Sequence, residues 1–244
     1  MLQHEHGDGT TTLTLDRPER GNALAADLVE ALIVQVDLAC RDAAVHTLVL
    51  RARGTHFCTG LDLSDLGTCS DGDLLLRLVR IETLLSALWH APMRTVAVAH
   101  GRVWGAGADL FAVCEQRVAQ ADASFRFPGA QFGIVLGTRR LAERIGTDAA
   151  RRLVTEGGEL DAMQAQAAGL VSTVGSEPLL PALRVSADTA RAIRSATRPD
   201  RRDADLAALV RSAAEPGLKL RIAAYRERLR VSAQKPLAIQ PIAS

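Results

Sequence analysis

The sequence VAVAHGRVWGAGADL at residues 96–110 places an apolar strand pattern before a turn of small residues and the expected start of a helix. A second stretch of the same design, LVLRARGTHFCTGLDL, occupies residues 48–63. The first N–H groups of a helix lack partners and lie at the positive end of its dipole. Two such turns meeting in space would offer two amide donors to one developing oxyanion. For either turn alone, a tight strand–helix connection is the simpler interpretation.

Short strands alternate with helices on both sides of these two stretches. We expect a hairpin over 2–16, a helix over 27–41, a strand over 47–51, a helix over 74–89, strands over 95–99 and 124–127, and a buried helix over 110–114. A capping box of Asp161 and Gln164 predicts a short helix that ends at Gly169, followed by a strand over 170–174. This alternation predicts an α/β fold. From Ala187 onward the pattern is helical, so we divide the chain into an α/β core (1–185) and a helical C-terminal region (186–244) with a loose tail from Lys235.

Composition excludes several classes of protein. The chain has 244 residues, of which 48% are hydrophobic, enough for one large core. A net charge of +1 gives no reason to expect a nucleic acid or a membrane surface as partner. The four cysteines lack the spacing of a metal site, and no apolar run approaches the ~20 residues that cross a membrane. Without an export leader, we expect a cytoplasmic protein.

Five motifs, in this order, resemble the crotonase (enoyl-CoA hydratase/isomerase) family. They are LDRPERGNAL at 15–24, FCTGLDL at 57–63, HGRVWGAGADL at 100–110, the segment 122–133, and AQAAGLV at 165–171. The resemblance covers roughly residues 10 to 175 and implies a crotonase-like spiral of ββα units with a helical C-terminal part. It also implies that this C-terminal part packs at subunit contacts in a homotrimer or a dimer of trimers. The apolar positions that would need burial there are Ile193, Leu206, Leu209, Leu220 and Ile222.

The resemblance assigns the oxyanion hole to the N–H groups of Leu61 and Ala106. Ala106 stands where the family usually has glycine, and it still donates its N–H if its φ is negative. The first of the two carboxylates that family hydratases use falls on Asp109, one methylene shorter than the usual glutamate. The second falls on Gly129, which has no side chain to titrate, and the loop that follows is about three residues short. Because general acid–base catalysis depends on both groups, two-carboxylate hydration is not favoured.

The resemblance therefore predicts an acyl-CoA enzyme that stabilises a thioester enolate, with isomerase-like chemistry favoured over plain hydration. CoA enters as part of the substrate, and no metal or nicotinamide cofactor is expected. One alternative is a catalytically degenerate member that keeps the fold for binding. Another is a CoA-thioester hydrolase or decarboxylase.

Further candidate residues surround the two turns. Arg20 and Arg53 are candidates for the CoA phosphates, and Cys58, Gly60, Leu61 and Gly105 belong to the turns expected to contact the thioester. Asp62 is expected to cap a helix, and His56 and His100 to make structural hydrogen bonds. Residues 64–73 are predicted to form a mobile loop that offers three spare carboxylates, Asp65, Asp71 and Asp73.

Overall fold

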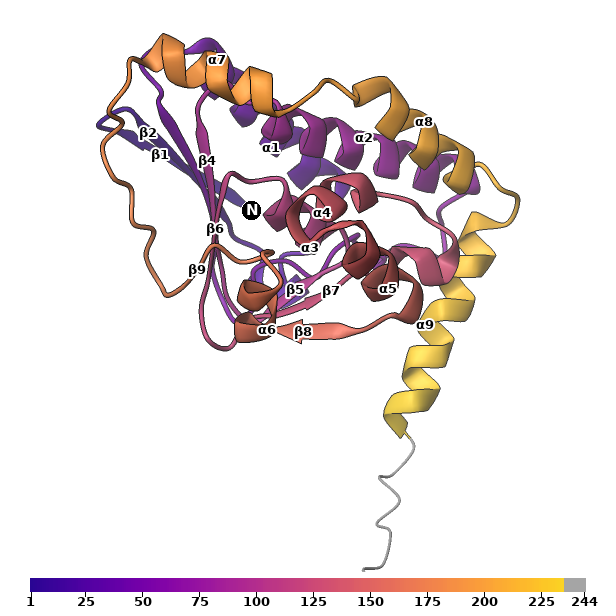
Figure 1. Ribbon diagram of the computed structural model, residues 1–244. Helices are drawn as coiled ribbons and strands as arrows, with labels where there is room; N and C mark the ends of the chain where they lie inside the picture. Colours follow the sequence, from indigo (N-terminus) through magenta and orange to yellow (C-terminus); the bar gives the residue numbers. More distant parts are fainter. Residues whose placement is uncertain (235–244) are drawn as a thin grey trace, which may run out of the picture.

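Two β-sheets and the helices packed on them make up the protein (Figure 1). The computed structural model describes residues 1–234, so the tail expected from Lys235 lies outside the described residues. In spatial order the six-stranded sheet contains β1 (Leu2–Gly7), β2 (Thr10–Leu15), β3 (Thr47–Ala52), β4 (Arg94–Ala99), β6 (Gln116–Ala119) and β9 (Thr173–Val174). The three-stranded sheet contains β5 (Arg102–Trp104), β7 (Ser124–Arg126) and β8 (Glu159–Asp161). The α/β prediction is confirmed.

The predicted hairpin is β1 and β2, which pair antiparallel. Its turn holds Asp8 and Gly9 at φ 49° and 67°, the two positive values that a tight hairpin turn requires. From β2 through β3, β4, β6 and β9 the sheet is parallel. The carboxyl ends of β3 and β4 therefore lie side by side, and this brings the two glycine-containing turns to one edge.

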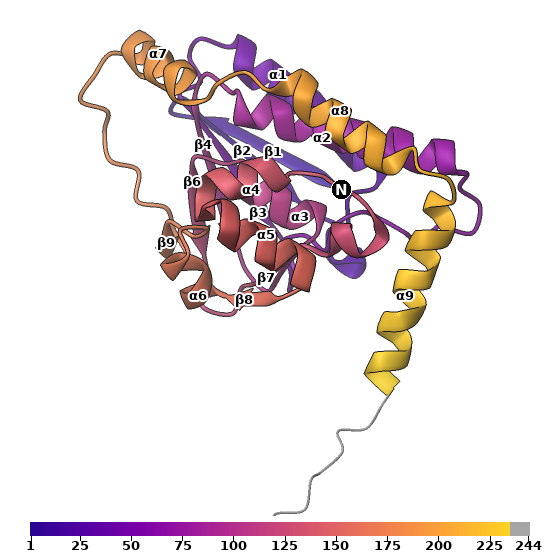
Figure 2. The same ribbon diagram turned by 45° about the vertical axis from the view of Figure 1, so that its right-hand side comes forward.

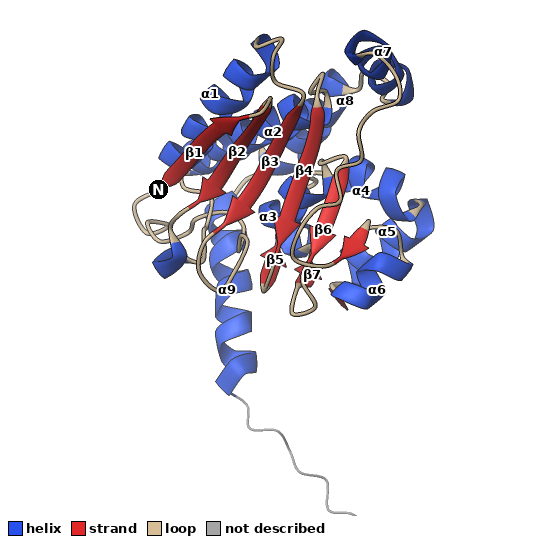
Figure 3. Ribbon diagram, turned by 90° about the vertical axis from the view of Figure 1, so that its left-hand side faces the viewer, coloured by secondary structure: helices blue, strands red, loops and turns tan. Residues whose placement is uncertain are grey.

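Helices cover one face of the large sheet and fill the space between the two sheets (Figures 1 and 3). They are η1 (Pro18–Arg20), α1 (Ala26–Arg41), α2 (Asp71–Trp89), α3 (Ala106–Ala112), η2 (Pro128–Phe132), α4 (Thr138–Ile145), α5 (Thr147–Glu156), α6 (Ala162–Ala167), α7 (Ala187–Thr197), α8 (Arg202–Ala213) and α9 (Leu218–Gln234). α2 begins three residues before the predicted start because Ser70 and Asp73 form a capping box. The predicted capping box of Asp161 and Gln164 is confirmed at α6.

The sheet buries both of its faces. Leu48, Leu50, Ala97 and Ala99 pack into the main core with the helices. On the opposite face, a small cluster of valines is covered where residues 175–186 run past β4 and β6 (Figure 3): Val49, Val96, Val98 and Val118. Arg94 on β4 fixes this segment by donating to the carbonyl of Pro181 at 3.1 Å.

The C-terminal helices pack on the core of the same chain. α8 lies along α2 (Figure 2), and a second buried cluster joins α2, α8, α9 and the loop before α2. Leu209 and Ile222, which were expected to need an intersubunit contact, are fully buried in this cluster. Ile193, Leu206 and Leu220 remain exposed. The expected oligomer and the division at residue 185 stay predictions.

In the part of the chain that the structure describes, no helix combines the length and apolar character that a membrane span requires.

Candidate active site

The two glycine-containing turns lie against each other. The backbone of residue 58 exchanges hydrogen bonds with β5: the Cys58 N–H donates to Arg102 at 3.2 Å, and the Trp104 N–H donates to the Cys58 carbonyl at 3.0 Å. Just beyond this bridge, a Cβ atom placed on Gly60 would lie 2.9 Å from the Trp104 carbonyl oxygen and 3.5 Å from the Ala106 nitrogen. Glycine is therefore needed for this approach, and it brings the Leu61 and Ala106 amides into one small region.

The N–H groups of Leu61 and Ala106 donate to no acceptor within residues 1–234. Ala106 is the first residue of α3, where an N–H has no acceptor in its own helix. Gly105 precedes it at φ 56° and ψ −131°, a conformation open to glycine alone. Among the described non-glycine residues only Asp8 and Asn22 have positive φ, so Ala106 meets the condition expected of it. The arrangement suits an oxyanion hole, and that role stays a prediction.

The first turn is not followed by a helix, which corrects one expectation. Leu61 forms a parallel bridge with Leu24, and the chain then runs through irregular turns until α2 begins at Asp71. The predicted helix cap at Asp62 is also wrong: Asp62 accepts from the Ser64 N–H at 2.9 Å and pairs with Arg17 at 3.2 Å. Only the Ala106 amide therefore has a helix behind it, since the Leu61 amide is positioned by the bridge.

A cavity of about 220 Å³ opens in front of the two amides. Its walls are mainly apolar and come from the two turns, from residues 127–141, and from α9. The residues from η2 and the loop after it include Pro128, Gly129, Phe132, Ile134 and Leu136, and those from α9 are Ile222, Tyr225, Arg226 and Leu229. Such a lining suits an acyl chain and leaves few polar groups for catalysis.

Asp109 projects from α3 into this cavity, and only 5% of the residue is exposed. Its Oδ1 atom is buried and has no hydrogen-bond partner in the described residues. Gly137, which precedes α4, lies so close that a Cβ atom there would overlap the carboxyl group. Burial raises the pKa of Asp109 well above the usual range, and Arg140 opposes this shift while Glu82 adds to it. A carboxyl group with a raised pKa is a stronger base than an exposed one, which suits a role in proton transfer.

A buried ionic pair stands behind Asp109. Arg140, which is 1% exposed, donates to both carboxylate oxygens of Glu82 at 2.9 and 2.5 Å. Arg140 also lies 3.1 Å from Asp205 on α8, which pairs with Arg139 at 2.6 Å. This network joins α2, α4 and α8 next to Asp109, so it holds the surroundings of Asp109 in place.

Among residues 1–234, the cavity lining holds no carboxylate besides Asp109. Gly129 lies in its wall, as the sequence predicts, and the N–H of Ile134 donates to its carbonyl at 2.9 Å. The three spare carboxylates do not line this cavity. Asp65 pairs with Arg77, Asp71 accepts from backbone N–H groups at the start of α9, and Asp73 belongs to the capping box of α2. Asp109 is thus the one carboxylate among the residues that line the cavity.

The remaining candidates have different outcomes. Gly60 and Gly105 line the cavity with the two amide-bearing residues, and so does Trp104, which precedes Gly105. Arg20 and Arg53 are exposed and lie outside the lining, so their contact with CoA phosphates stays a prediction. Cys58 is fully buried, burial raises the pKa of its thiol to about 12, and its contribution is the backbone bridge.

Both histidines beside the turns have backbone neighbours. The His100 ring lies 2.9 Å from the Gly54 carbonyl oxygen, and the His56 ring accepts from the Arg102 N–H at 3.3 Å. The structural role expected of them fits these contacts. Within residues 1–234 no cluster of three metal-ligating side chains occurs.

Sequence reasoning missed the contribution of α9. Tyr225 and Arg226 face the cavity, and the Tyr225 ring packs on Phe132 of η2 with centroids 5.2 Å apart. Arg226 donates to the carbonyl of Leu63 at 3.1 Å. The spacing of Leu218, Ile222 and Tyr225 marks one apolar helix face, but it does not say which surface that face covers.

Comparisons with known proteins agree with this geometry. Residues 5–200 match the family model described as enoyl-CoA hydratase/isomerase. The chain is 34% identical over 179 residues to the Mycobacterium tuberculosis protein named "Probable enoyl-CoA hydratase echA6", covering 72% of this chain and 71% of that one. It is 33% identical to the 2,3-dehydroadipyl-CoA hydratase of Escherichia coli, covering 66% of this chain and 64% of that one.

A crystal structure assigned to an enoyl-CoA hydratase/isomerase of Bordetella parapertussis superposes with a TM-score of 0.88 at 43% identity, covering 96% of this chain and 99% of that one. The enoyl-CoA hydratase structure from Bacillus halodurans, at 20% identity and a TM-score of 0.78, shares the fold; the match covers 91% of this chain and 99% of that one. The expected crotonase-like α/β fold with a helical C-terminal part is confirmed by these matches.

Proposed function

Because the chain belongs to the enoyl-CoA hydratase/isomerase (crotonase) family, we propose that it binds an acyl-CoA thioester and moves a proton between carbons of the acyl group. The thioester carbonyl oxygen accepts from the N–H groups of Leu61 and Ala106. Asp109 is the acid/base group. CoA is part of the substrate in this reaction.

One observation carries the proposal: two unpartnered amides and one buried carboxyl group converge on a single apolar cavity. Backbone donors that need no reorganisation stabilise negative charge on a thioester oxygen effectively. The apolar walls strengthen this attraction because they exclude water.

The proposed step is a shift of the double bond. The ionised Asp109 carboxylate takes a proton from the carbon next to the thioester, and the electrons of the broken C–H bond move into an enolate held by the two amides. The same carboxyl group returns the proton at the far end of the conjugated system, so neither water nor a redox partner enters. A raised pKa helps both halves, because it makes the carboxylate a stronger base and holds the proton on the carboxyl group until it is returned.

Hydration is disfavoured because Gly129 supplies no second carboxylate to position the water. The degenerate binding protein is the second candidate, and this absence is the observation that favours it. A hydrolase or decarboxylase would rely on Asp109, because the carboxylates of residues 65–73 have partners outside the cavity.

The test supplies a 3-enoyl-CoA and follows the absorbance of the conjugated thioester. Asp109→Asn is expected to reduce turnover by about 10²–10⁴-fold while acyl-CoA affinity, measured by calorimetry, stays within a few-fold. Tyr225→Phe is the matched control, because it changes another polar group in the cavity and leaves Asp109 in place. Unchanged turnover in Asp109→Asn would contradict the proposal; binding without turnover in the unmodified protein would favour the degenerate member.

A further inference from the structure

A second cavity, of about 280 Å³, lies at the C-terminal end of α2 and shares no lining residue with the Asp109 cavity. Its walls come from the end of α2 and the loop after it, from α7, and from the connection to α8. Four arginines contribute to the lining, together with one carboxylate: Arg191, Arg194, Arg198, Arg202 and Asp200. The cavity is therefore surrounded by more positive than negative charge.

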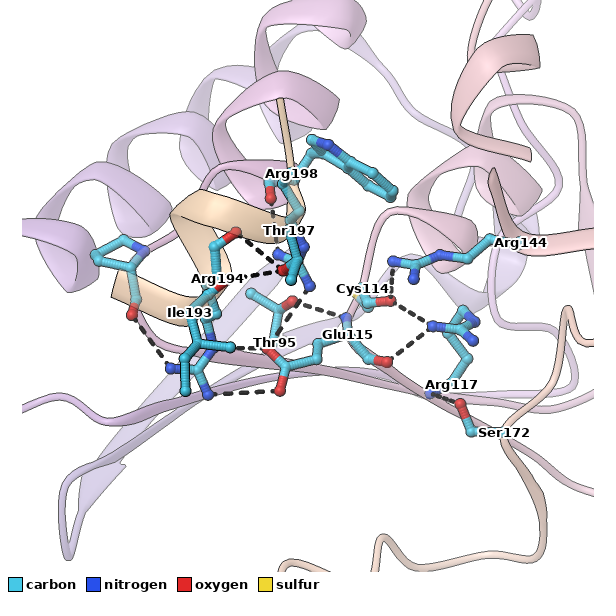
Figure 4. A network of polar contacts seen from close by, with 12 residues as sticks. Thr95, Cys114, Glu115, Arg117, Arg144, Ser172, Ile193, Arg194, Thr197 and Arg198 are labelled. Atoms are coloured by element: carbon cyan, nitrogen blue, oxygen red, sulfur yellow. Dashed lines mark hydrogen bonds and ion pairs between the residues drawn. The ribbon is translucent and has the colours of Figure 1, made fainter. Parts of the chain in front are cut away.

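Two of these arginines share a single counterion (Figure 4). Glu115 accepts from Arg194 at 2.6 Å and lies 3.6 Å from Arg198. Arg202 lies 3.3 Å from Asp200, and Arg191 has no hydrogen bond or ion pair with any residue in 1–234. The four guanidinium groups therefore outnumber their two carboxylate partners, Glu115 and Asp200.

Two further arginines, both at least half-buried, lie near the arginines that line the cavity. Arg117 and Arg144 donate to the same carbonyl, that of Cys114, at 2.9 and 3.0 Å (Figure 4). Burial, followed by the charges of Arg117 and Arg198, lowers the pKa of Arg144 to about 9. An anion that approaches such a cluster lowers its electrostatic energy, because it offsets the repulsion between the positive charges.

Two ring nitrogens in lining residues lack partners. Trp89 is 2% exposed, and its indole N–H has no acceptor in the described residues. The buried Nε2 of His90 also has no hydrogen bond there, its nearest carboxylate oxygen being that of Asp200 at 3.9 Å. Both nitrogens are buried and not exposed at the cavity surface, so the arginines supply the donors for a ligand in the cavity.

We infer that this cavity binds a phosphate-type oxyanion, either free inorganic phosphate or the phosphate of a monoester. The planar guanidinium group of arginine fits two phosphate oxygens at once, and four such groups surround the space. A dianion offsets the surplus positive charge of these arginines. Asp200 also lines the cavity, and its negative charge opposes the binding of an anion there.

The test uses the full chain carrying Trp104→Phe, which leaves Trp89 as its one tryptophan. Inorganic phosphate and adenosine monophosphate are titrated separately at constant ionic strength, and Trp89 emission and calorimetry are followed. We expect saturable binding with a change in Trp89 emission. Tighter binding of the monophosphate assigns the site to a monoester, and equal binding assigns it to free phosphate.

Variants distinguish specific binding in this cavity from nonspecific attraction of anions to the protein surface. The double variant Arg191→Ala/Arg202→Ala removes exposed groups and is expected to weaken binding by about tenfold or more. Asp200→Asn is expected to tighten binding, an effect that loss of structure would not produce. The control Arg151→Ala/Arg211→Ala removes two exposed arginines outside the cavity and is expected to bind normally. Equal binding by the double variant and this control, or no saturable emission change into the millimolar range, would overturn the inference.

Discussion

Asp109 and Gly129 line the same cavity, but only Asp109 has a carboxyl group. We therefore propose a reaction that needs one acid/base group. The resemblance to the crotonase family assigned both positions, because each lies within a short motif that can be matched residue by residue. It could not predict that Asp109 lies against Gly137 and near the Arg140–Glu82 pair, since these residues are distant along the chain. The character of the one carboxylate therefore depends on packing between elements.

Stability of the protein should respond to pH through Asp109. The unfolded carboxyl ionises near a pKa of ~3.9, whereas burial raises the folded pKa well above that value. Between these two pKa values the folded state holds more protons than the unfolded state, so this group's contribution to stability falls as pH rises. Asp109→Asn lacks this titration, and its stability relative to the unmodified protein should increase with pH across that window. Urea denaturation of both proteins from pH 5 to pH 8 checks this; a difference that is constant with pH would contradict the assignment.

Restoring the second carboxylate should add hydratase activity. Gly129 is not in the left-handed region, and a Cβ atom there would meet the Ile134 carbonyl oxygen at 3.4 Å, so a side chain fits with a small adjustment. Gly129→Glu is expected to raise hydration of a 2-enoyl-CoA by up to about 10²-fold. Gly129→Gln has the same shape and cannot transfer a proton, so equal rates in the two variants would show that the carboxylate is not the cause.

At the scale of elements, longer and more regular segments were the easier ones to predict. The hairpin, α1, β3, β4 and α6 follow from periodicity and capping residues. Strands β5, β6 and β8 have three or four residues each, too few for a pattern to emerge, and they exist because neighbouring strands pair with them. The cover that α9 provides over the cavity depends in the same way on long-range packing.

The link between α2 and α4 can be tested through the Arg140–Glu82 pair. Arg140→Met would leave the Glu82 carboxylate buried without its partner, and we expect a loss of about 3–5 kcal/mol in the free energy of unfolding. Arg140→Met/Glu82→Leu removes both charges and should recover most of that loss. Urea denaturation of the two variants measures the difference. If they were equally destabilised, packing at residue 140 would be the cause, and the ion pair would contribute little.

At the scale of the whole molecule, the C-terminal helices have two surfaces. One is buried against α2 and the Asp109 cavity, and the other exposes Ile193, Leu206 and Leu220. The sequence indicated an amphipathic helical region, but it could not separate burial within the chain from burial between chains, because both demand the same pattern.

We predict that the exposed surface of these helices contributes to a trimer or a dimer of trimers. Light scattering at micromolar concentration should give three or six times the 26.0 kDa chain mass. Replacing Leu206 and Leu220 with Glu should shift the protein toward smaller species, because buried charge opposes association. A 26.0 kDa species in the unmodified protein would contradict the prediction.

The most direct test of the central claim is a crystal structure of the Asp109→Asn variant with a 3-enoyl-CoA bound. We predict that the thioester oxygen lies about 2.7–3.1 Å from the nitrogens of both Leu61 and Ala106. We also predict that the residue 109 side chain lies beside the carbon next to the thioester. A thioester oxygen bound elsewhere, with both amides bonded to water, would contradict the account.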